Sequence, residues 1–215
     1  MPTKSTKPLA HAQKTPDQIG LERLIFFSDA VIAIAITLLS LDIRLPAVEG
    51  PIDNARMTQL LVGIWPKYVA YVISFLVIGL SWVGHHRKFR VIQRYDSRLL
   101  LLNLLFLMVI AFIPFPTSLI SEYGNRPATI FYALVMIVAA AMSDLMWIYA
   151  SHGNRLIDPH LDKNRRRRET LGPLLVIAVF GLSIGLAYID ENLARSSWAL
   201  VALAQLIYRS KPGQA

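Results

Sequence analysis

One segment near the start of the sequence, residues 23–42, constrains the fold of this chain more than any other. It reads RLIFFSDAVIAIAITLLSLD, in which an arginine, a serine and an aspartate precede a nearly pure run of isoleucine, alanine and leucine. About 20 mostly apolar residues in a helix are enough to cross a bilayer. An aspartate at the centre of such a helix costs roughly 2.5–3.5 kcal/mol, so it usually faces protein or water. We therefore expect a membrane-spanning helix with a polar end that contacts protein or water.

The rest of the composition favours several such helices. Of the 215 residues, 54% are hydrophobic and only 17% are charged, which is more apolar than a soluble domain of this length requires. The absence of cysteine excludes disulfides, thiolate metal sites and cysteine nucleophiles. We predict an all-α, polytopic membrane protein with six transmembrane helices. The predicted spans are Leu21–Ile43, Pro66–Gly84, Leu99–Ile120, Ala128–Ala150, Leu171–Ile189 and Leu193–Tyr208.

We predict one transmembrane domain, residues 21–208, between two polar ends. Residues 1–20 are polar, contain proline and lack the apolar core of a signal peptide, so we expect a disordered cytoplasmic N-terminus that leaves the first span in place. Residues 209–215 are predicted to form a cytoplasmic tail. The third span contains Pro114 and Pro116, which should kink it because proline removes a backbone donor.

The basic residues indicate the orientation of the spans. The net charge of +8 would suit a nucleic-acid partner, but the distribution of the 22 lysines and arginines follows the predicted topology instead. Because positive residues favour the cytoplasm, we expect both termini inside, no nucleic-acid partner, and topology as the reason for the run 165–168. An anionic-lipid site is the alternative for that run. The connections on the opposite side carry only Arg44, Arg56, Lys67, Arg126 and Arg195.

The apolar part of the first span has one face of particular interest. Positions three, four and seven apart share a face of a helix, which groups Ile34, Thr37, Leu38 and Leu41. One interpretation is ordinary packing against lipid or other helices. The other is a hydrophobic constriction that gates ions by dewetting or tight closure, with Thr37 as its one hydroxyl.

The polar end of the first span should meet the end of the second at the same depth. Arg23 and Asp29 lie in the first, and His85 and His86 end the second. Adjacent histidines point to different faces, so a metal site is disfavoured. A structural network that satisfies the buried charge is one interpretation, and interfacial anchoring is the other. In the fourth span, Asp144 lies in apolar surroundings with no partner evident from the sequence.

Two common enzyme motifs are absent from the sequence. It contains no HExxH and no glycine-rich phosphate loop, and we expect neither an enzyme nor a cofactor. A TVGYG-type filter is also absent, which excludes a conventional potassium-channel pore loop.

Three motifs resemble one family. Arg23 followed by Phe27-Ser28-Asp29 and AVIAIAITLLSLDI is similar to the first-helix signature of the prokaryotic relatives of the lysosomal potassium channel, transmembrane protein 175. The end of the second span, Trp82-xx-His85-His86-Arg87, and the run from Asn103 to Pro114-Phe115-Pro116-Thr117 in the third are similar to that family too. The resemblance covers the first three spans well and the last three mainly in length and topology.

The resemblance implies a homotetramer in which the four first helices line a central pore that passes potassium in modest preference to sodium. By position, the constriction falls on Ile34, Leu38 and Leu41 and the selectivity hydroxyl layer on Thr37, whereas Ala33 replaces a serine found in some relatives. The implied partners are further copies of the chain, membrane lipids and permeant potassium ions, in the plasma (inner) membrane of a prokaryote. The implied structural polar network comprises Arg23, Ser28, Asp29 and a histidine, for which we favour His85 over His86.

Three alternatives remain open at this point. A proton-coupled secondary transporter could use Asp29, Asp144 and His85, although such proteins tend to carry paired broken helices and only the third span here contains a break signal. A channel that leaks protons is the second alternative. A non-conducting membrane scaffold is the third.

Overall fold

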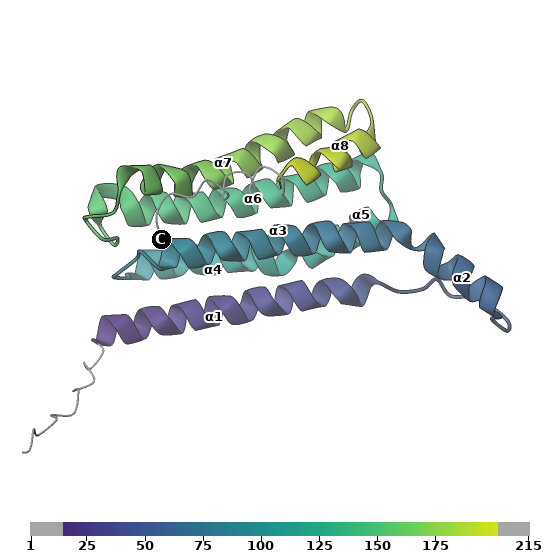
Figure 1. The fold of residues 1–215 in the computed structure, drawn as a ribbon, viewed down its shortest axis with the longest axis horizontal. Coiled ribbons are helices and arrows are strands. Elements are labelled where there is room, and N and C mark those ends of the chain that lie inside the picture. The colour runs from purple at the N-terminus through teal and green to yellow at the C-terminus, as the bar shows by residue number, and fades with distance from the viewer. Residues whose placement is uncertain (1–14, 202–215) are drawn as a thin grey trace, which may run out of the picture.

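The computed structural model describes residues 15–201, and the regular secondary structure of this part of the chain is helical apart from one isolated antiparallel bridge between Ile92 and Ile157. Figure 1 shows long helices running side by side in layers. In chain order the helices are α1 (Pro16–Leu38), the 3-10 turn η1 (Leu39–Asp42), α2 (Asn54–Gly63), α3 (Trp65–Phe89), α4 (Ser97–Phe112), α5 (Pro114–Glu122), α6 (Arg126–Ser151), η2 (His152–Asn154), α7 (Lys163–Leu186) and α8 (Glu191–Ser197).

Five helical segments of the described part are long and apolar enough to cross a membrane, and they correspond to the first five predicted spans. The chain is therefore an all-α, polytopic membrane protein. α8 begins two residues before the predicted sixth span, of which residues 202–208 lie outside the described part, as does the predicted tail 209–215. The five segments are Asp17–Asp42, Trp65–Phe89, Ser97–Glu122, Arg126–Asn154 and Lys163–Leu186.

The first helix begins earlier than predicted. Thr15 caps it, because its hydroxyl accepts from the Gln18 backbone N–H while the Gln18 side chain accepts from the Thr15 N–H. Pro16 occupies the first helical position, where its missing N–H has no cost. The predicted disordered segment 1–20 is thus wrong for residues 16–20, and residues 1–14 lie outside the described part.

The third span is broken where its prolines predict a kink. α4 ends at Phe112 and α5 begins at Pro114, with Ile113 between them. Three buried hydroxyls fix α5, the second half of this span. The Thr117 hydroxyl lies 2.9 Å from the Ser74 hydroxyl of α3, and the Ser74 hydroxyl lies 2.9 Å from the Tyr132 hydroxyl of α6. We call Ser74, Thr117 and Tyr132 the hydroxyl cluster. It holds three helices together in the apolar core.

The layers place α1 at the edge of the bundle. Figure 1 shows α6, α7 and α8 on one side, α3, α4 and α5 in the middle, and α1 on the far side. α1 contacts α3 and α4, and α6 packs against α4 and α7. The main core lies between these layers around Ile78, Phe106, Ile110 and Tyr132. Because only one side of α1 meets the bundle, its other side is exposed within a single subunit.

The two loops at one end of the bundle are joined through Asp96. This carboxylate caps α4 by accepting from the Leu99 N–H, accepts from the Tyr149 hydroxyl at 2.5 Å and pairs with Arg155 at 3.4 Å. Burial opposes ionisation of Asp96, but the Tyr149 hydrogen bond, the backbone donors and the Arg155 charge together lower its pKa below the ordinary value. The ionised form is thus favoured by folding.

We expect Asp96→Asn to lower the free energy of unfolding by about 1 kcal/mol at pH 7, because the charge-assisted contacts are lost. A carboxyl whose folded pKa is depressed stabilises the protein above its unfolded pKa of about 3.9, and this contribution disappears as the pH falls through the folded value. Thermal unfolding in detergent from pH 7 to pH 3 should therefore show a difference between the two proteins that shrinks at acid pH. A difference independent of pH would contradict this assignment.

Candidate pore-lining face and its polar support

α1 has two chemically distinct faces. One side is buried against α3 and α4, at Leu24, Ser28, Ile32, Ala35 and, in η1, Leu39. These positions recur every three or four residues, as a single helical face requires. The opposite face is exposed and is the one that the sequence predicts as the constriction. It contains Ile34, Thr37, Leu38 and, in η1, Leu41.

Hydroxyl groups on this exposed face are oriented by the helix backbone. The Thr37 hydroxyl donates to the Ile34 carbonyl at 2.8 Å, and the Ser40 hydroxyl donates to the Thr37 carbonyl at 2.8 Å. Because each hydroxyl hydrogen is used within the helix, the oxygen lone pairs remain available to a cation or a water molecule. Thr37 is the one hydroxyl among the four predicted pore residues.

A buried relay of side chains holds α1 to α3 and α4. His85 Nε2 lies 2.8 Å from Asn103 Oδ1, and Asn103 Nδ2 donates to Ser28 Oγ at 2.9 Å. Ser28 in turn donates its only hydroxyl hydrogen to the Leu24 carbonyl. This donor order requires the proton of neutral His85 to be on Nε2. We call His85, Asn103 and Ser28 the relay.

A second contact holds the next residue of α1. The Trp82 indole N–H in α3 donates to Asp29 Oδ1 at 2.7 Å. Arg23 is exposed and takes part in no hydrogen bond or ion pair with residues 15–201. Of the predicted network of Arg23, Ser28, Asp29 and His85, Ser28 and His85 are joined through Asn103, and Asp29 is bonded to Trp82. Arg23 joins neither contact within residues 15–201, and the network as a whole stays a prediction.

The two adjacent histidines have different surroundings. His85 is fully buried between the rings of Phe89 and Phe106, at 4.3 and 5.5 Å between centroids. His86 is exposed and lies beside Trp82. Sequence reasoning did not assign Asn103 to the relay or Trp82 to Asp29, although both belong to the motifs on which the family resemblance rests. The available signal for both contacts was a polar side chain at the same predicted depth in the membrane as its partner.

Metal chemistry has no support in the described residues. Across residues 15–201, no group of three or more histidine, aspartate or glutamate side chains is arranged to hold a metal ion. The arrangement can instead present a largely apolar helix face, with the exposed Thr37 hydroxyl on it, to whatever lies beside α1.

Comparison with known proteins identifies the family. A family model for the endosomal/lysosomal potassium channel TMEM175 matches residues 23–114, which contain the exposed face of α1, the relay and the Trp82–Asp29 contact. A protein of Streptomyces collinus named as a potassium channel is 40% identical over 182 residues, covering 82% of this chain and 87% of its own. The chain belongs to the TMEM175 family. Members of this family are ion channels, so the prediction of a channel rather than an enzyme is confirmed.

The fold agrees with a solved TMEM175 structure. The crystal structure of a homologue from Chamaesiphon minutus, described as a lysosomal potassium-selective channel homologue, matches with a TM-score of 0.78 and 29% identity. The match covers 90% of this chain and 100% of the chain in that crystal structure. The human TMEM175, named as an endosomal/lysosomal proton channel, is 29% identical over 159 residues, which cover 72% of this chain and 31% of the human protein.

Proposed function

We propose that this chain forms a homotetrameric potassium channel whose four α1 helices line a central pore. Ile34, Leu38 and Leu41 form the apolar constriction, and Thr37 supplies the hydroxyl layer. One observation carries the proposal: the face with these four residues is exposed in the subunit, while the opposite face of α1 is anchored by the relay. The 40% identity to a protein named as a potassium channel supports the choice of ion.

Selectivity in such a pore depends on dehydration. An apolar constriction offers no cage of carbonyl oxygens, so an ion must keep part of its hydration shell or exchange it for the Thr37 hydroxyls. Stripping water from sodium costs more than stripping it from potassium, so a narrow pore with weak ligands favours potassium modestly. The lone pairs left free by the Thr37–Ile34 hydrogen bond suit this role.

The distribution of charges supports a placement in the membrane. We propose six spans with both termini in the cytoplasm, in the plasma membrane of a prokaryote, with lipids as the other contacts of the tetramer. His86, Arg87 and Lys88 in the last turn of α3 agree with a cytoplasmic end there. The second span thus ends at the side on which the first begins.

Proton permeation is the second candidate function. The human relative is named as a proton channel, and a pore with an apolar constriction could pass protons along a transient water chain. A proton-coupled transporter through Asp29, Asp144 and His85 has less support, because Asp29 and His85 make separate contacts, with Trp82 and Asn103. Single-channel currents would separate a channel from a transporter.

The deciding experiment is flux from liposomes that contain the purified protein. Potassium, sodium and proton gradients are imposed separately, and the subunit number is measured by native mass spectrometry. We expect a tetramer with potassium flux exceeding sodium flux. A monomer, or a tetramer without potassium flux, would overturn the proposal, and proton flux alone would favour the second candidate.

We expect Thr37→Val to bring the potassium-to-sodium permeability ratio close to one. The change removes four hydroxyl ligands from the pore while keeping the shape of the side chain, and each lost polar contact is worth about 0.5–1.5 kcal/mol. A fall of about two- to tenfold in the ratio follows. Reversal potentials under mixed ions measure it. Thr37→Ser retains the hydroxyl and should preserve the ratio; an unchanged ratio in Thr37→Val would remove Thr37 from the selectivity layer.

A further inference from the structure

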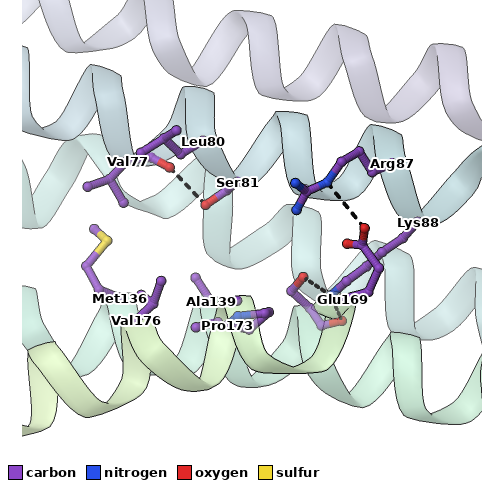
Figure 2. A pocket seen from close by; sticks show the side chains of 14 residues that line it. Val77, Leu80, Ser81, Arg87, Lys88, Met136, Ala139, Glu169, Pro173 and Val176 are labelled. Atoms are coloured by element: carbon purple, nitrogen blue, oxygen red, sulfur yellow. Dashed lines mark hydrogen bonds and ion pairs between the residues drawn. The ribbon is translucent and has the colours of Figure 1, made fainter. Parts of the chain in front are cut away.

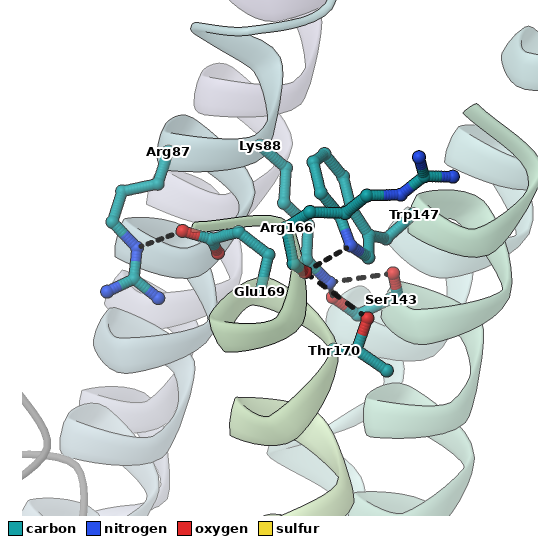
Figure 3. A network of polar contacts seen from close by, with 7 residues as sticks. All are labelled: Arg87, Lys88, Ser143, Trp147, Arg166, Glu169 and Thr170. Carbon is teal, nitrogen blue, oxygen red and sulfur yellow. Dashed lines mark hydrogen bonds and ion pairs between the residues drawn. The ribbon is translucent and has the colours of Figure 1, made fainter. Parts of the chain in front are cut away.

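The last turns of α3 carry a second polar cluster, on the side away from α1. Figure 3 shows Lys88 reaching α6, where its ammonium donates to both the carbonyl and the hydroxyl of Ser143 at 2.9 Å. Beside it, Arg87 Nε lies 3.4 Å from Glu169 Oε1 of α7. Lys88 is 1% exposed, and Glu169 is also buried. Arg87, Lys88 and Glu169 lie on two of the helices that are long and apolar enough to cross a membrane, a few residues beyond the apolar spans predicted from the sequence. A buried charge at such a place is costly unless it is paired.

The charges in this region balance. The carboxylates of Asp144 and Glu169 act electrostatically on the Lys88 ammonium, so two cations, Arg87 and Lys88, face two acidic groups. We call these four residues the ion cluster. Asp144 Oδ1 is buried without a hydrogen-bond partner among residues 15–201. The positive charge of Lys88 therefore compensates for the burial of this carboxylate. Removing Arg87 would leave the buried Glu169 carboxylate without its ion-pair partner, which costs far more than losing an exposed pair.

A cavity separates α3 from α6 and α7 next to the ion cluster. Figure 2 shows this space between Val77 and Ser81 on one side and Met136 and Pro173 on the others. Its volume is about 50 Å³, so side chains do not fill this interface completely. The ion cluster fastens α3 at one end of the cavity, and the hydroxyl cluster lies beyond its other end, one turn before Val77 along α3.

Helix α7 has a weak point at the same place. Pro173 lies inside α7 and has no N–H, so the carbonyl of Glu169, four residues earlier, lacks its helical donor. Helices bend readily at such a position. This turn of α7 is the one whose backbone is least constrained, and the side chain of Glu169 holds it to α3.

α3 thus connects the peripheral helices to α1. On one face, Trp82 and His85 hold α1 through Asp29 and the relay. At most two turns further on, Arg87 and Lys88 hold α7 and α6. Because one rigid helical segment bears both sets of contacts, a shift of α3 at the ion cluster must also shift the residues that hold α1.

We propose that Arg87, Lys88 and Glu169 are positioning residues for the pore: they fix the α3 segment that holds α1 and thereby set ion flux and selectivity. This inference rests on the proposed channel function. None of the three touches the permeant ion. Their effect is exerted through Trp82, His85 and Asn103, which contact α1 or bridge to it.

The test uses charge reversal of the ion pair in the reconstituted tetramer. Arg87→Glu and Glu169→Arg alone should each change potassium flux and the potassium-to-sodium ratio by about two- to thirtyfold, the range expected for remote coupling. The double variant restores the pair with opposite orientation and should return both values toward wild type. Arg165 is an exposed residue of α7, the helix that bears Glu169. Arg165→Gln is therefore the matched control and should change neither the potassium flux nor the ratio.

The outcomes are distinct. If the wild type conducts and both single variants keep its flux and ratio, the inference is overturned and the channel function remains intact. If the wild type does not conduct, the proposed function itself is overturned. If the single variants alter flux and the double variant does not restore it, a specific Arg87–Glu169 pair is also contradicted. If a reversal variant fails to assemble, Ser143→Ala removes only one hydroxyl contact to Lys88; an altered ratio in assembled Ser143→Ala supports the inference, and an unaltered one contradicts it.

Discussion

Replacing Ile34 by asparagine should raise ion flux about tenfold or more and reduce the preference for potassium. Four amide side chains in place of four isoleucines would hydrate the narrowest part of the proposed pore, so the dewetting barrier falls. A decrease of about 1.4 kcal/mol in a barrier is sufficient for a tenfold change in rate. Sodium should gain more than potassium, because a wetter constriction demands less dehydration. Liposome flux under separate potassium and sodium gradients measures both effects.

Leu182→Asn provides a matched control for this change. Leu182 lies on α7 and is 59% exposed, the same exposed fraction as Ile34. It introduces the same amide on a helix of the opposite layer from α1, so it should leave flux and selectivity unchanged. Equal effects from the two substitutions would indicate a general disturbance of the membrane domain. No effect from Ile34→Asn would remove this residue from the ion path.

The features that sequence could predict are those fixed within one helix. The exposed face with Ile34, Thr37 and Leu38 follows from helical periodicity, and the break at Ile113–Pro114 follows from the chemistry of proline. Five spans follow from apolar length alone. None of these inferences requires knowledge of how one helix lies against another. The start of α1 was misplaced because the Thr15–Gln18 capping box lies in a polar, proline-bearing stretch.

The features that sequence could not predict are pairings between helices. His85 and Asp29 lie at similar depth, yet a rotation of the two helices about their axes decides whether they meet. In the structure, Asn103 from a third helix reaches His85, and Trp82 reaches Asp29. Lys88 was predicted as part of the cytoplasmic basic pattern but is buried against Ser143. Charge patterning reports the side of the membrane, not the partner.

The relay gives the second large expected effect. In Asn103→Leu, the buried Nε2–H of His85 loses its acceptor and Ser28 Oγ loses its donor. Leaving two buried polar groups unsatisfied costs about 2 kcal/mol or more, which corresponds to a fall of about 4–8 °C in the melting temperature for a chain of this size. Because the relay holds α1, potassium flux should fall as well. Thermal unfolding in detergent and liposome flux measure the two effects.

A double-mutant cycle with His85 decides whether the relay acts as one unit. Replacing His85 by leucine leaves Asn103 Oδ1 without its donor, whereas replacing both residues removes the donor and the acceptor together and leaves Ser28 as the one relay member without its side-chain partner. The destabilisation of the double variant should therefore be smaller than the sum of the two single effects, by about 0.5–3 kcal/mol. Additive effects would mean that His85 and Asn103 stabilise α1 independently, through packing alone. The coupling itself distinguishes a hydrogen-bonded support for the pore helix from two buried side chains that are merely adjacent.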